Sequence, residues 1–240
     1  MTTLSIGAHS APLDAARPAQ SAIAWPAAAL LAVFALQLHL VFTRSINWDE
    51  FHYLALVHEL ARGELSEPLQ SFHTRLFAWL PMLGISGVDQ IVRGRVVMWL
   101  AEIATCASIV LIARRFVTLD RALCCALAYA SVIYVMQHGF AFRFDPLSIS
   151  LSMMSLAILA RSHLSPIALA AFAVLMGVAF MVTIKVVLLL PAFAGIAWLR
   201  WSEAEFTRAQ AIRLAAAPLL AAGVAGLLYL WHVSGLPEAG

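Results

Sequence analysis

Residues 45–53, Ser45-Ile46-Asn47-Trp48-Asp49-Glu50-Phe51-His52-Tyr53, form the stretch around which the rest of this chain is interpreted. Asn47 followed three residues later by Glu50 is the pattern of a capping box, so a helix is predicted to begin directly after Asn47. Apolar residues then recur at helical spacing until Gly63, a residue that favours the end of a helix. The sequence therefore predicts an amphipathic helix over residues 48–62.

One face of this predicted helix carries an acid, an imidazole and a phenol. Asp49, His52 and Tyr53 are three or four residues apart, so their side chains are expected to lie on the same side. The stretch directly follows an apolar run, which places it at the boundary between membrane and water. A solvated, well-capped surface helix explains this pattern as well as a functional site does.

The composition predicts an integral membrane protein. The 240 residues are 62% hydrophobic and 12% charged, whereas soluble domains have about 45–50% and about 25%. The net charge of +2 argues neither for nor against nucleic-acid binding, and no basic tract supports it. The three cysteines show neither the spacing of a metal site nor a disulfide framework.

Seven membrane spans are predicted from the apolar runs, the first over residues 22–42. The other six are predicted over 94–113, 122–137, 146–160, 165–182, 186–199 and 214–231. Residues 1–20 are poor in bulky apolar side chains and are predicted to be a disordered cytoplasmic tail. Residues 21–233 then form one transmembrane module, and 234–240 form a short outer tail.

The first outer loop, residues 44–93, is predicted to hold a second interfacial helix over 71–88. This segment is apolar, but polar residues, Pro81 and two glycines interrupt it. Its uninterrupted apolar part is about half a bilayer thick, so the segment is not counted as a span. That decision places Asp49 and Asp145 on the same side of the membrane. Lys and Arg residues divide almost equally between the two sides, so their location in short inner turns guides the orientation more than their number.

A second charged motif lies in the predicted outer turn between the third and fourth spans. It reads Gln137-His138-Gly139-Phe140-Ala141-Phe142-Arg143-Phe144-Asp145-Pro146. Charged residues at membrane depth are costly and usually functional, although an Arg–Asp pair that only reaches the lipid headgroups also fits. Lys185, the only lysine in the chain, lies at the same outer face, where a positive membrane anchor is the alternative.

The outer face is thus predicted to gather Asp49, Glu50, Arg143, Asp145 and Lys185. Carboxylates can orient and deprotonate a hydroxyl, and cations can hold a phosphate while negative charge develops on it. Arginine suits phosphate because its planar fork donates two parallel hydrogen bonds. With lipid on one side and water on the other, these groups suit the transfer of a sugar from a lipid phosphate.

Several segments resemble the GT-C-fold glycosyltransferases, in particular family 39-like members. The segments at 48–53, 61–65 (Ala-Arg-Gly-Glu-Leu) and 69–73 (Leu-Gln-Ser-Phe-His) resemble the first outer loop of that family. Arg143-x-Asp145-Pro146 resembles its second acidic motif, and 177–185 resembles its "G…TK" segment with one inserted residue. The most similar members are bacterial enzymes related to the protein mannosyltransferases and to the aminoarabinose transferase of lipid A. The resemblance covers residues 21–232.

The resemblance implies an all-α module of seven transmembrane helices and two interfacial helices, located in the bacterial inner membrane with a cytoplasmic N-terminus. It implies an inverting transferase that moves a sugar from a polyprenyl-phosphate donor to a hydroxyl acceptor on a glycan, lipid or protein at the outer face. No cofactor is required; a divalent metal is optional, and no metal site is indicated. The implied roles are catalytic for Asp49, Glu50 and Asp145, donor-phosphate binding for Arg143, Lys185, His73 and Arg75, and supporting for His52, Tyr53 and His138.

Two other functional classes stay open. A lipid-sugar transporter or flippase needs charged residues deep within several spans, and only Glu102 is placed there, where an Arg or His partner is expected. A non-catalytic or split membrane subunit is the other class, because members of the resembled family continue beyond the seventh span. The chain is therefore predicted to be truncated or to need a second chain that supplies a C-terminal part.

Overall fold

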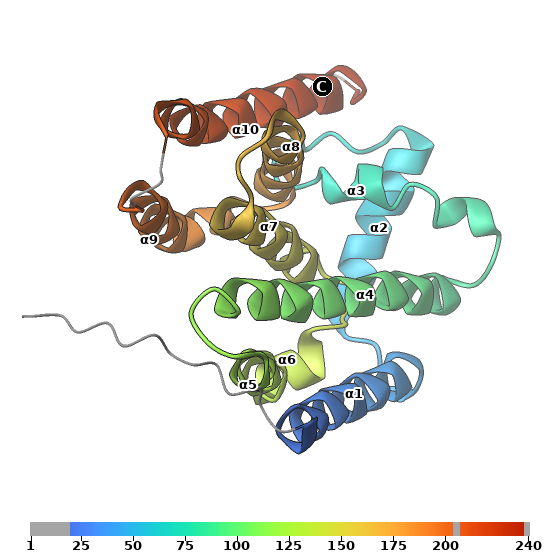
Figure 1. Ribbon diagram of the computed structural model, residues 1–240. Helices are drawn as coiled ribbons and strands as arrows, with labels where there is room; N and C mark the ends of the chain where they lie inside the picture. The colour runs from blue at the N-terminus through green and yellow to red at the C-terminus, as the bar shows by residue number, and fades with distance from the viewer. Residues whose placement is uncertain (1–19, 204–206, 238–240) are drawn as a thin grey trace, which may run out of the picture.

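The computed structural model describes residues 20–203 and 207–237, in which every regular element is helical (Figure 1). The α-helices are α1 (Gln20–Thr43), α2 (Trp48–Arg62), α3 (His73–Leu76), α4 (Gly87–Ala113), α5 (Leu119–Ala130), α6 (Ile133–His138), α7 (Phe144–Arg161), α8 (Pro166–Val182), α9 (Leu190–Trp201) and α10 (Arg208–Ser234). Two short 3₁₀ helices, η1 (Pro81–Leu83) and η2 (Ile184–Leu189), lie between them. The all-α prediction is confirmed for the described residues.

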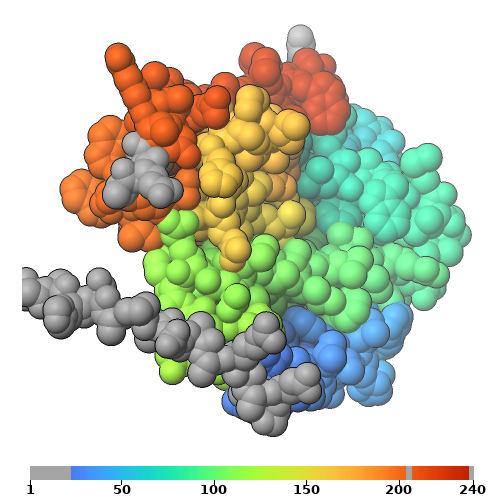
Figure 2. Space-filling model, in the orientation of Figure 1, coloured from blue at the N-terminus to red at the C-terminus, as the bar shows by residue number. Residues whose placement is uncertain are grey.

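The long helices α1, α4, α7, α8 and α10 pack side by side in that order. Helix α4 packs against α1, α5 and α7, while α8 packs between α7 and α10. The same order is visible on the surface, where α1, α4, the α7–α8 region and α10 follow one another from bottom to top (Figure 2). Helix α2 packs against α4, and the short α3 packs against α2, so the predicted first outer loop covers one end of the bundle.

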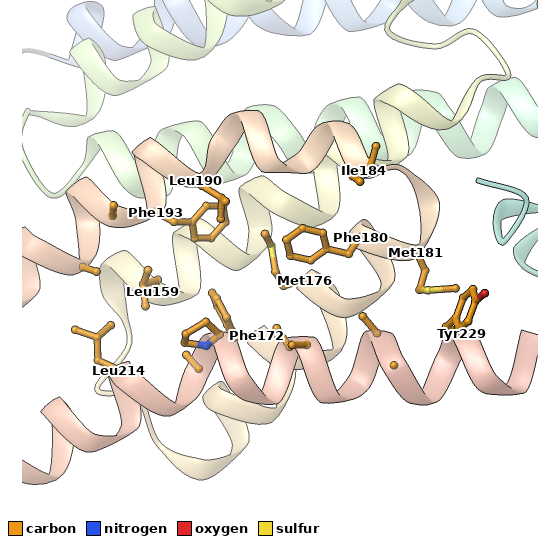
Figure 3. Close-up of a pocket in the computed structure, with 18 of the residues that line it drawn as sticks. Leu159, Phe172, Met176, Phe180, Met181, Ile184, Leu190, Phe193, Leu214 and Tyr229 are labelled. Carbon is orange, nitrogen blue, oxygen red and sulfur yellow. The ribbon is translucent and has the colours of Figure 1, made fainter. Parts of the chain in front are cut away.

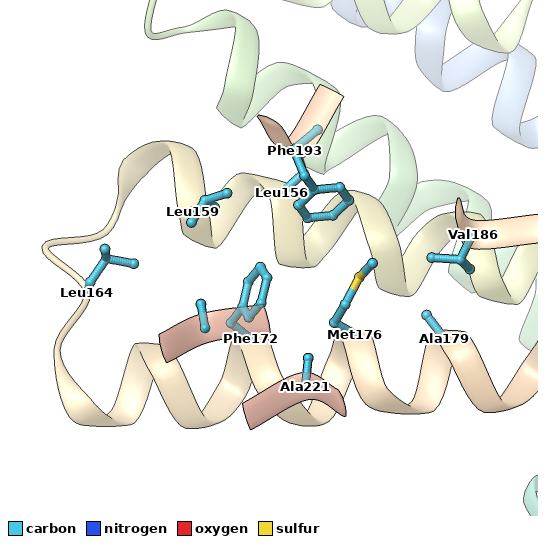
Figure 4. Packing of buried hydrophobic residues seen from close by; sticks show 10 residues of the cluster. Leu156, Leu159, Leu164, Phe172, Met176, Ala179, Val186, Phe193 and Ala221 are labelled. Carbon is cyan, nitrogen blue, oxygen red and sulfur yellow. The ribbon is translucent and has the colours of Figure 1, made fainter. Parts of the chain in front are cut away.

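The largest buried cluster joins the second half of the chain. Leu156 and Leu159 of α7 pack against Phe172 and Met176 of α8, and Phe193 of α9 closes the same cluster (Figure 4). Burying a large apolar side chain stabilises a fold by about 1.5–3 kcal/mol. This cluster therefore holds α7, α8 and α9 together as one unit.

Five helical segments in the described residues are long and apolar enough to cross a membrane. They are Ile23–Thr43, Gly87–Ala113, Phe144–Arg161, Ile184–Trp201 and Arg208–Ser234. Helix α8 is also apolar but has only 17 residues. The structure thus agrees with a multi-pass membrane protein and accounts for five of the seven predicted spans.

The predicted span 122–137 is not one helix. It consists of α5 and α6, separated at Ser131 and Val132, where Val132 has an extended backbone (φ −60°, ψ 126°). Two β-branched residues in a row, Val132 and Ile133, lower the helix propensity at this point. The predicted span 186–199 also differs, because η2 precedes α9 and Pro191, which lacks an N–H group, stands in the first turn of α9.

The prediction of one helix over 71–88 is wrong. This segment contains only the four-residue α3, a run of turns and the three-residue η1. The 3₁₀ helix η1 ends at Gly84, which has a left-handed backbone (φ 65°), and Ser86 then caps the start of α4. By contrast, the helix predicted over 48–62 is present with those bounds as α2, which begins at an Asn47–Glu50 capping box and ends at Gly63 (φ 71°).

Candidate functional site

A buried ion pair joins the segments that carry the predicted site residues. The Nε of Arg95 donates to Oε2 of Glu50 at 2.7 Å, and its Nη2 donates to Oε1 at 2.7 Å. Both side chains are only 2% exposed. Such forked Arg–carboxylate pairs are geometrically specific as well as strong. The pair therefore fixes the first turn of α2 on α4.

Arg95 also fixes the end of α1. Its other N–H groups donate to the carbonyl oxygens of Val41 (3.2 Å), Arg44 (2.9 Å) and Ser45 (3.0 Å). All five N–H groups of the guanidinium therefore have a partner. Carbonyls at the C-terminus of a helix lack partners within the helix, so a cation placed there satisfies both their hydrogen bonding and the helix dipole.

Glu50 links α2 to the turn directly before α7. Its carboxylate accepts hydrogen bonds from the backbone N–H of Asn47 at 3.0 Å and of Phe142 at 2.9 Å. Burial raises the pKa of Glu50, but the bonds from Arg95 and these two N–H groups outweigh it and hold that pKa below its usual value. Because Glu50 is 1% exposed and fully hydrogen-bonded, we assign it a positioning role instead of the catalytic role expected from the sequence.

The packing of this turn depends on a glycine next to Arg95. The ring of Phe142 lies directly against Gly94 of α4, in the space that a Cβ atom at Gly94 would occupy. Phe142 itself is buried among Leu54, Phe77 and other apolar residues of the same cluster. This close contact brings the backbone N–H of Phe142 to Glu50 and orients the following residue, Arg143.

Four of the predicted site residues meet in one chain of ion pairs at the surface. Arg143 lies 3.3 Å from Asp49 and 3.5 Å from Asp145, and Lys185 lies 3.0 Å from Asp145. They come from three separate segments, namely α2, the start of α7 and η2. The side chains of Asp49 and Lys185 are 41% and 60% exposed, so both are accessible. The cluster combines two carboxylates with two cations at one place.

Aromatic rings pack directly beneath this ionic cluster. The ring of Tyr53 lies 4.6 Å from that of Phe144 and 5.5 Å from that of His73. The ammonium of Lys185 lies 5.9 Å from the centre of the Phe144 ring. Burial raises the pKa of the Tyr53 phenol, so this group is neutral near pH 7. The rings give the cluster an apolar, rigid base.

His73 is buried and uncharged, which corrects its predicted role. Its Nδ1–H donates to the carbonyl oxygen of Gln70 at 3.1 Å, and its side chain is 2% exposed. Burial lowers the pKa of His73 to about 4, so the ring carries no charge near pH 7. A neutral, buried ring cannot serve as the phosphate-binding cation expected from the sequence.

Arg75 was expected to bind the donor phosphate, but its side chain contacts residues at the end of α10. Its Nε donates to Nδ1 of His232 at 3.2 Å, its Nη2 donates to the carbonyl oxygen of His232 at 3.1 Å, and its guanidinium lies over the ring of Trp231. Ser71 contacts the other ring nitrogen of His232 at 2.9 Å. Arg75 therefore ties the α3 region to the end of α10 and is not part of the ionic cluster.

The two remaining predicted histidines lie on either side of the site. His52 is exposed on α2, with its ring 5.5 Å from that of Tyr53. His138 lines a small polar cavity of about 230 Å³, which Glu50 and Arg95 also line. Neither has a hydrogen bond to Asp49 or Asp145 among the residues that the structure describes.

Sequence reasoning missed Arg95 and misjudged Glu102. An arginine inside an otherwise apolar run was the available signal for Arg95, because such a charge requires a partner in the fold. Glu102 is buried, and in the described part of the chain its partners are the hydroxyl of Tyr129 (3.5 Å) and the thiol of Cys106 (4.0 Å). The expected Arg or His partner is therefore not found, and Arg95 pairs with Glu50 instead.

A long apolar cavity of about 900 Å³ opens between α8, α9 and α10. Figure 3 shows Leu159 and Leu214 toward one end and Ile184 and Tyr229 toward the other. Gln70 also lines it, and its carbonyl holds the His73 ring. Ile184, at this end of the cavity, directly precedes Lys185 of the ionic cluster in the sequence, although the four ionic residues are not among those that line the cavity.

Within residues 20–203 and 207–237, no group of three or more His, Cys, Asp or Glu side chains has the arrangement of a metal site. The ionic cluster supplies only two carboxylates, and each is paired with a cation. No protein-family model, curated protein or solved structure matches this chain. The functional argument therefore rests on the geometry of the site.

Proposed function

We propose that this protein is a membrane glycosyltransferase that moves a sugar from a polyprenyl-phosphate donor to an acceptor hydroxyl. One observation carries the proposal: an apolar cavity of about 900 Å³ ends at Ile184, beside Lys185 and its partner Asp145. A polyprenyl chain needs an apolar channel, and its phosphate needs cations at the mouth of that channel. The protein offers both within a few residues.

The donor phosphate is proposed to lie between Arg143 and Lys185. Both cations contact Asp145, which holds them in one place. Arginine offers two parallel N–H groups to phosphate oxygens, and lysine adds a compact charge. These cations bind the phosphate of the donor, and they also stabilise the negative charge that grows on that phosphate as the sugar leaves.

Asp49 is proposed to receive the proton of the acceptor. The acceptor oxygen attacks the anomeric carbon while the bond between that carbon and the donor phosphate oxygen breaks. The hydroxyl proton passes to the Asp49 carboxylate, and the electron pair of the broken bond stays on the phosphate. Attack from the face opposite the phosphate inverts the configuration of the sugar. A positioned base of this kind contributes about 10²–10⁴-fold to the rate.

The proposal includes an orientation. Helix α8 and the α5–α6 pair would complete seven spans with the five apolar segments, and α2 would lie at the outer surface of a bacterial inner membrane. The N-terminus is then cytoplasmic, and the ionic cluster faces outward, where glycan, lipid or protein hydroxyls are available.

The experiment uses the purified full chain in proteoliposomes with polyprenyl-phosphate donors that carry different labelled sugars. Transfer of label to a hydroxyl acceptor, with release of polyprenyl phosphate, is the expected result. Movement of intact donor between the two leaflets without transfer would identify a flippase instead. Failure of every donor, with and without added membrane extracts, would contradict the proposal.

A further inference from the structure

A second groove lies at the opposite end of α7 from the ionic cluster. Helix α7 has 18 residues and therefore extends about 27 Å between its ends. At its far end a groove of about 470 Å³ lies between α4 and α7 and ends at Arg161 and Ser162. Its apolar wall includes Ala104, Ala107 and Leu111 of α4 and Met154, Ala157 and Ile158 of α7.

The groove is open because small side chains line it. Three of the residues in its wall are alanines, and Ala107 and Leu111 are exposed. Both α4 and α7 are candidate membrane spans, so this open apolar surface faces lipid. A groove of this kind accepts the hydrocarbon chain of a lipid without loss of any hydrogen bond.

The mouth of the groove carries a cation, Arg161, for which the described residues supply no carboxylate partner. Arg161 is exposed, and its Nη1 donates to the carbonyl oxygen of Leu111 at 3.0 Å, which holds the guanidinium at the groove. Among the described residues no carboxylate lies within 4.0 Å of Arg161, whereas the nearby Arg115 is paired with Glu203. Arg114 directly follows α4 and is exposed, and in the described part of the chain no carboxylate lies within 4.0 Å of its guanidinium either.

We infer that this groove binds an anionic phospholipid, with one acyl chain between α4 and α7 and the headgroup phosphate on Arg161. Charge complementarity selects this occupant: the guanidinium fork matches phosphate oxygens, and basic residues at a membrane surface attract anionic lipids. A helix from a second copy would also fill an apolar groove, but it would need to bring a carboxylate to Arg161. The inference does not depend on the proposed transferase activity.

The test is native mass spectrometry of the full chain in detergent with added phosphatidylglycerol or phosphatidylcholine that have identical acyl chains. Wild-type protein should retain more phosphatidylglycerol than phosphatidylcholine. Arg161→Gln should reduce that preference about fivefold, the effect of one basic residue at an anionic surface. Ala107→Phe, which fills the groove, should reduce retention of both lipids.

Two matched variants serve as controls. Arg121→Gln removes another exposed arginine, and Ala128→Phe enlarges another exposed alanine, both on α5 and outside the groove; neither should change lipid retention. If Arg161→Gln does not fold, Arg161→Lys keeps the charge and should lose only part of the preference. Equal retention of the two lipids by wild-type protein would overturn the inference. A dimer that Ala107→Phe dissociates would also overturn it, since the groove would then be an interface between copies.

Discussion

The guanidinium of Arg95 and the carboxylate of Glu50 form a buried, two-bond ion pair in which both hydrogen bonds measure 2.7 Å. The pair joins two residues that are 45 positions apart in the sequence. Glu50 also binds the backbone N–H of Phe142, and Asp49 and Arg143 are the direct neighbours of these two residues. The pair therefore determines where the exposed ionic cluster is assembled.

Removal of one partner of this pair should destabilise the fold. Arg95→Leu leaves a buried, unpaired carboxylate, which should lower the free energy of unfolding by about 3–5 kcal/mol. Arg93→Gln, at an exposed position on the same helix, should have little effect. Thermal unfolding in detergent measures the stability of both variants. The double variant Arg95→Leu with Glu50→Leu should recover part of the loss, and an unchanged midpoint for Arg95→Leu alone would disprove the structural role.

Arg143 should matter more for the donor than for the acceptor. Arg143→Gln removes a charged hydrogen-bond donor to the phosphate, so the KM for the donor should rise about tenfold to hundredfold. Arg143→Lys should restore only part of the effect because the fork is lost. Steady-state kinetics with each substrate varied in turn provide the measurement, and Arg62→Gln, an exposed arginine of the same outer region, is the control. Equal donor KM values in Arg143→Gln and wild type would favour a simple membrane anchor.

The apolar cavity should select donors by chain length. Ala222 lines the cavity from an exposed position of α10, so Ala222→Trp should narrow it without disturbing the buried core. The narrowed cavity should exclude one or two methylene groups of a long-chain polyprenyl donor, each of which contributes about 0.8 kcal/mol when buried. The KM for this donor should therefore rise several-fold. A short-chain donor should be affected less. Ala215→Trp, on the same helix but outside the cavity, should leave the KM for both donors unchanged. Identical effects of Ala222→Trp and Ala215→Trp would argue against binding of the polyprenyl chain in this cavity.

Stability should fall below neutral pH because of His73. The pKa of His73 is about 4 in the folded protein, whereas the ordinary value for histidine, expected in the unfolded chain, is 6.5. Between pH 4 and pH 6.5 the unfolded chain therefore binds a proton at His73 that the folded protein does not. Stability from this group is therefore complete above about pH 6.5 and decreases as the pH falls toward 4, by on the order of 3 kcal/mol. His73→Gln should flatten this part of the profile of unfolding free energy against pH, whereas His52→Gln, at an exposed position, should not. Parallel profiles for wild type and His73→Gln would show that His73 titrates normally.

Local signals in the sequence predicted local structure well. The capping box at Asn47 and Glu50 and the glycine at 63 define α2 to the residue, because each acts within one helical turn. The apolar runs likewise predicted the bounds of α1, α7 and α8 closely, whereas α10 begins at Arg208, six residues before the predicted start at 214. The segment 71–88 was mispredicted because its apolar content outweighed Pro81 and Gly84, the residues that break it.

The parts of the site that depend on tertiary contacts were not predictable in the same way. The chemical types of Asp49, Arg143, Asp145 and Lys185 suggested a shared site, and the structure brings all four together. The capping pattern gave Glu50 a local function, but nothing near it in sequence indicates that Arg95 would bury its carboxylate. Such pairs depend on how α1, α2 and α4 pack, which no single stretch encodes.

The most direct test of the account is the rate of sugar transfer by Asp49→Asn in proteoliposomes. Asp49 is 41% exposed and lies on the surface of α2, so the variant should fold with wild-type helicity and unfolding temperature. Glu64→Gln, an exposed acid in the same outer region, should keep full activity. The account predicts that Asp49→Asn loses about 10²–10⁴-fold in turnover, the contribution of one general base. Wild-type turnover by the folded Asp49→Asn protein would contradict it.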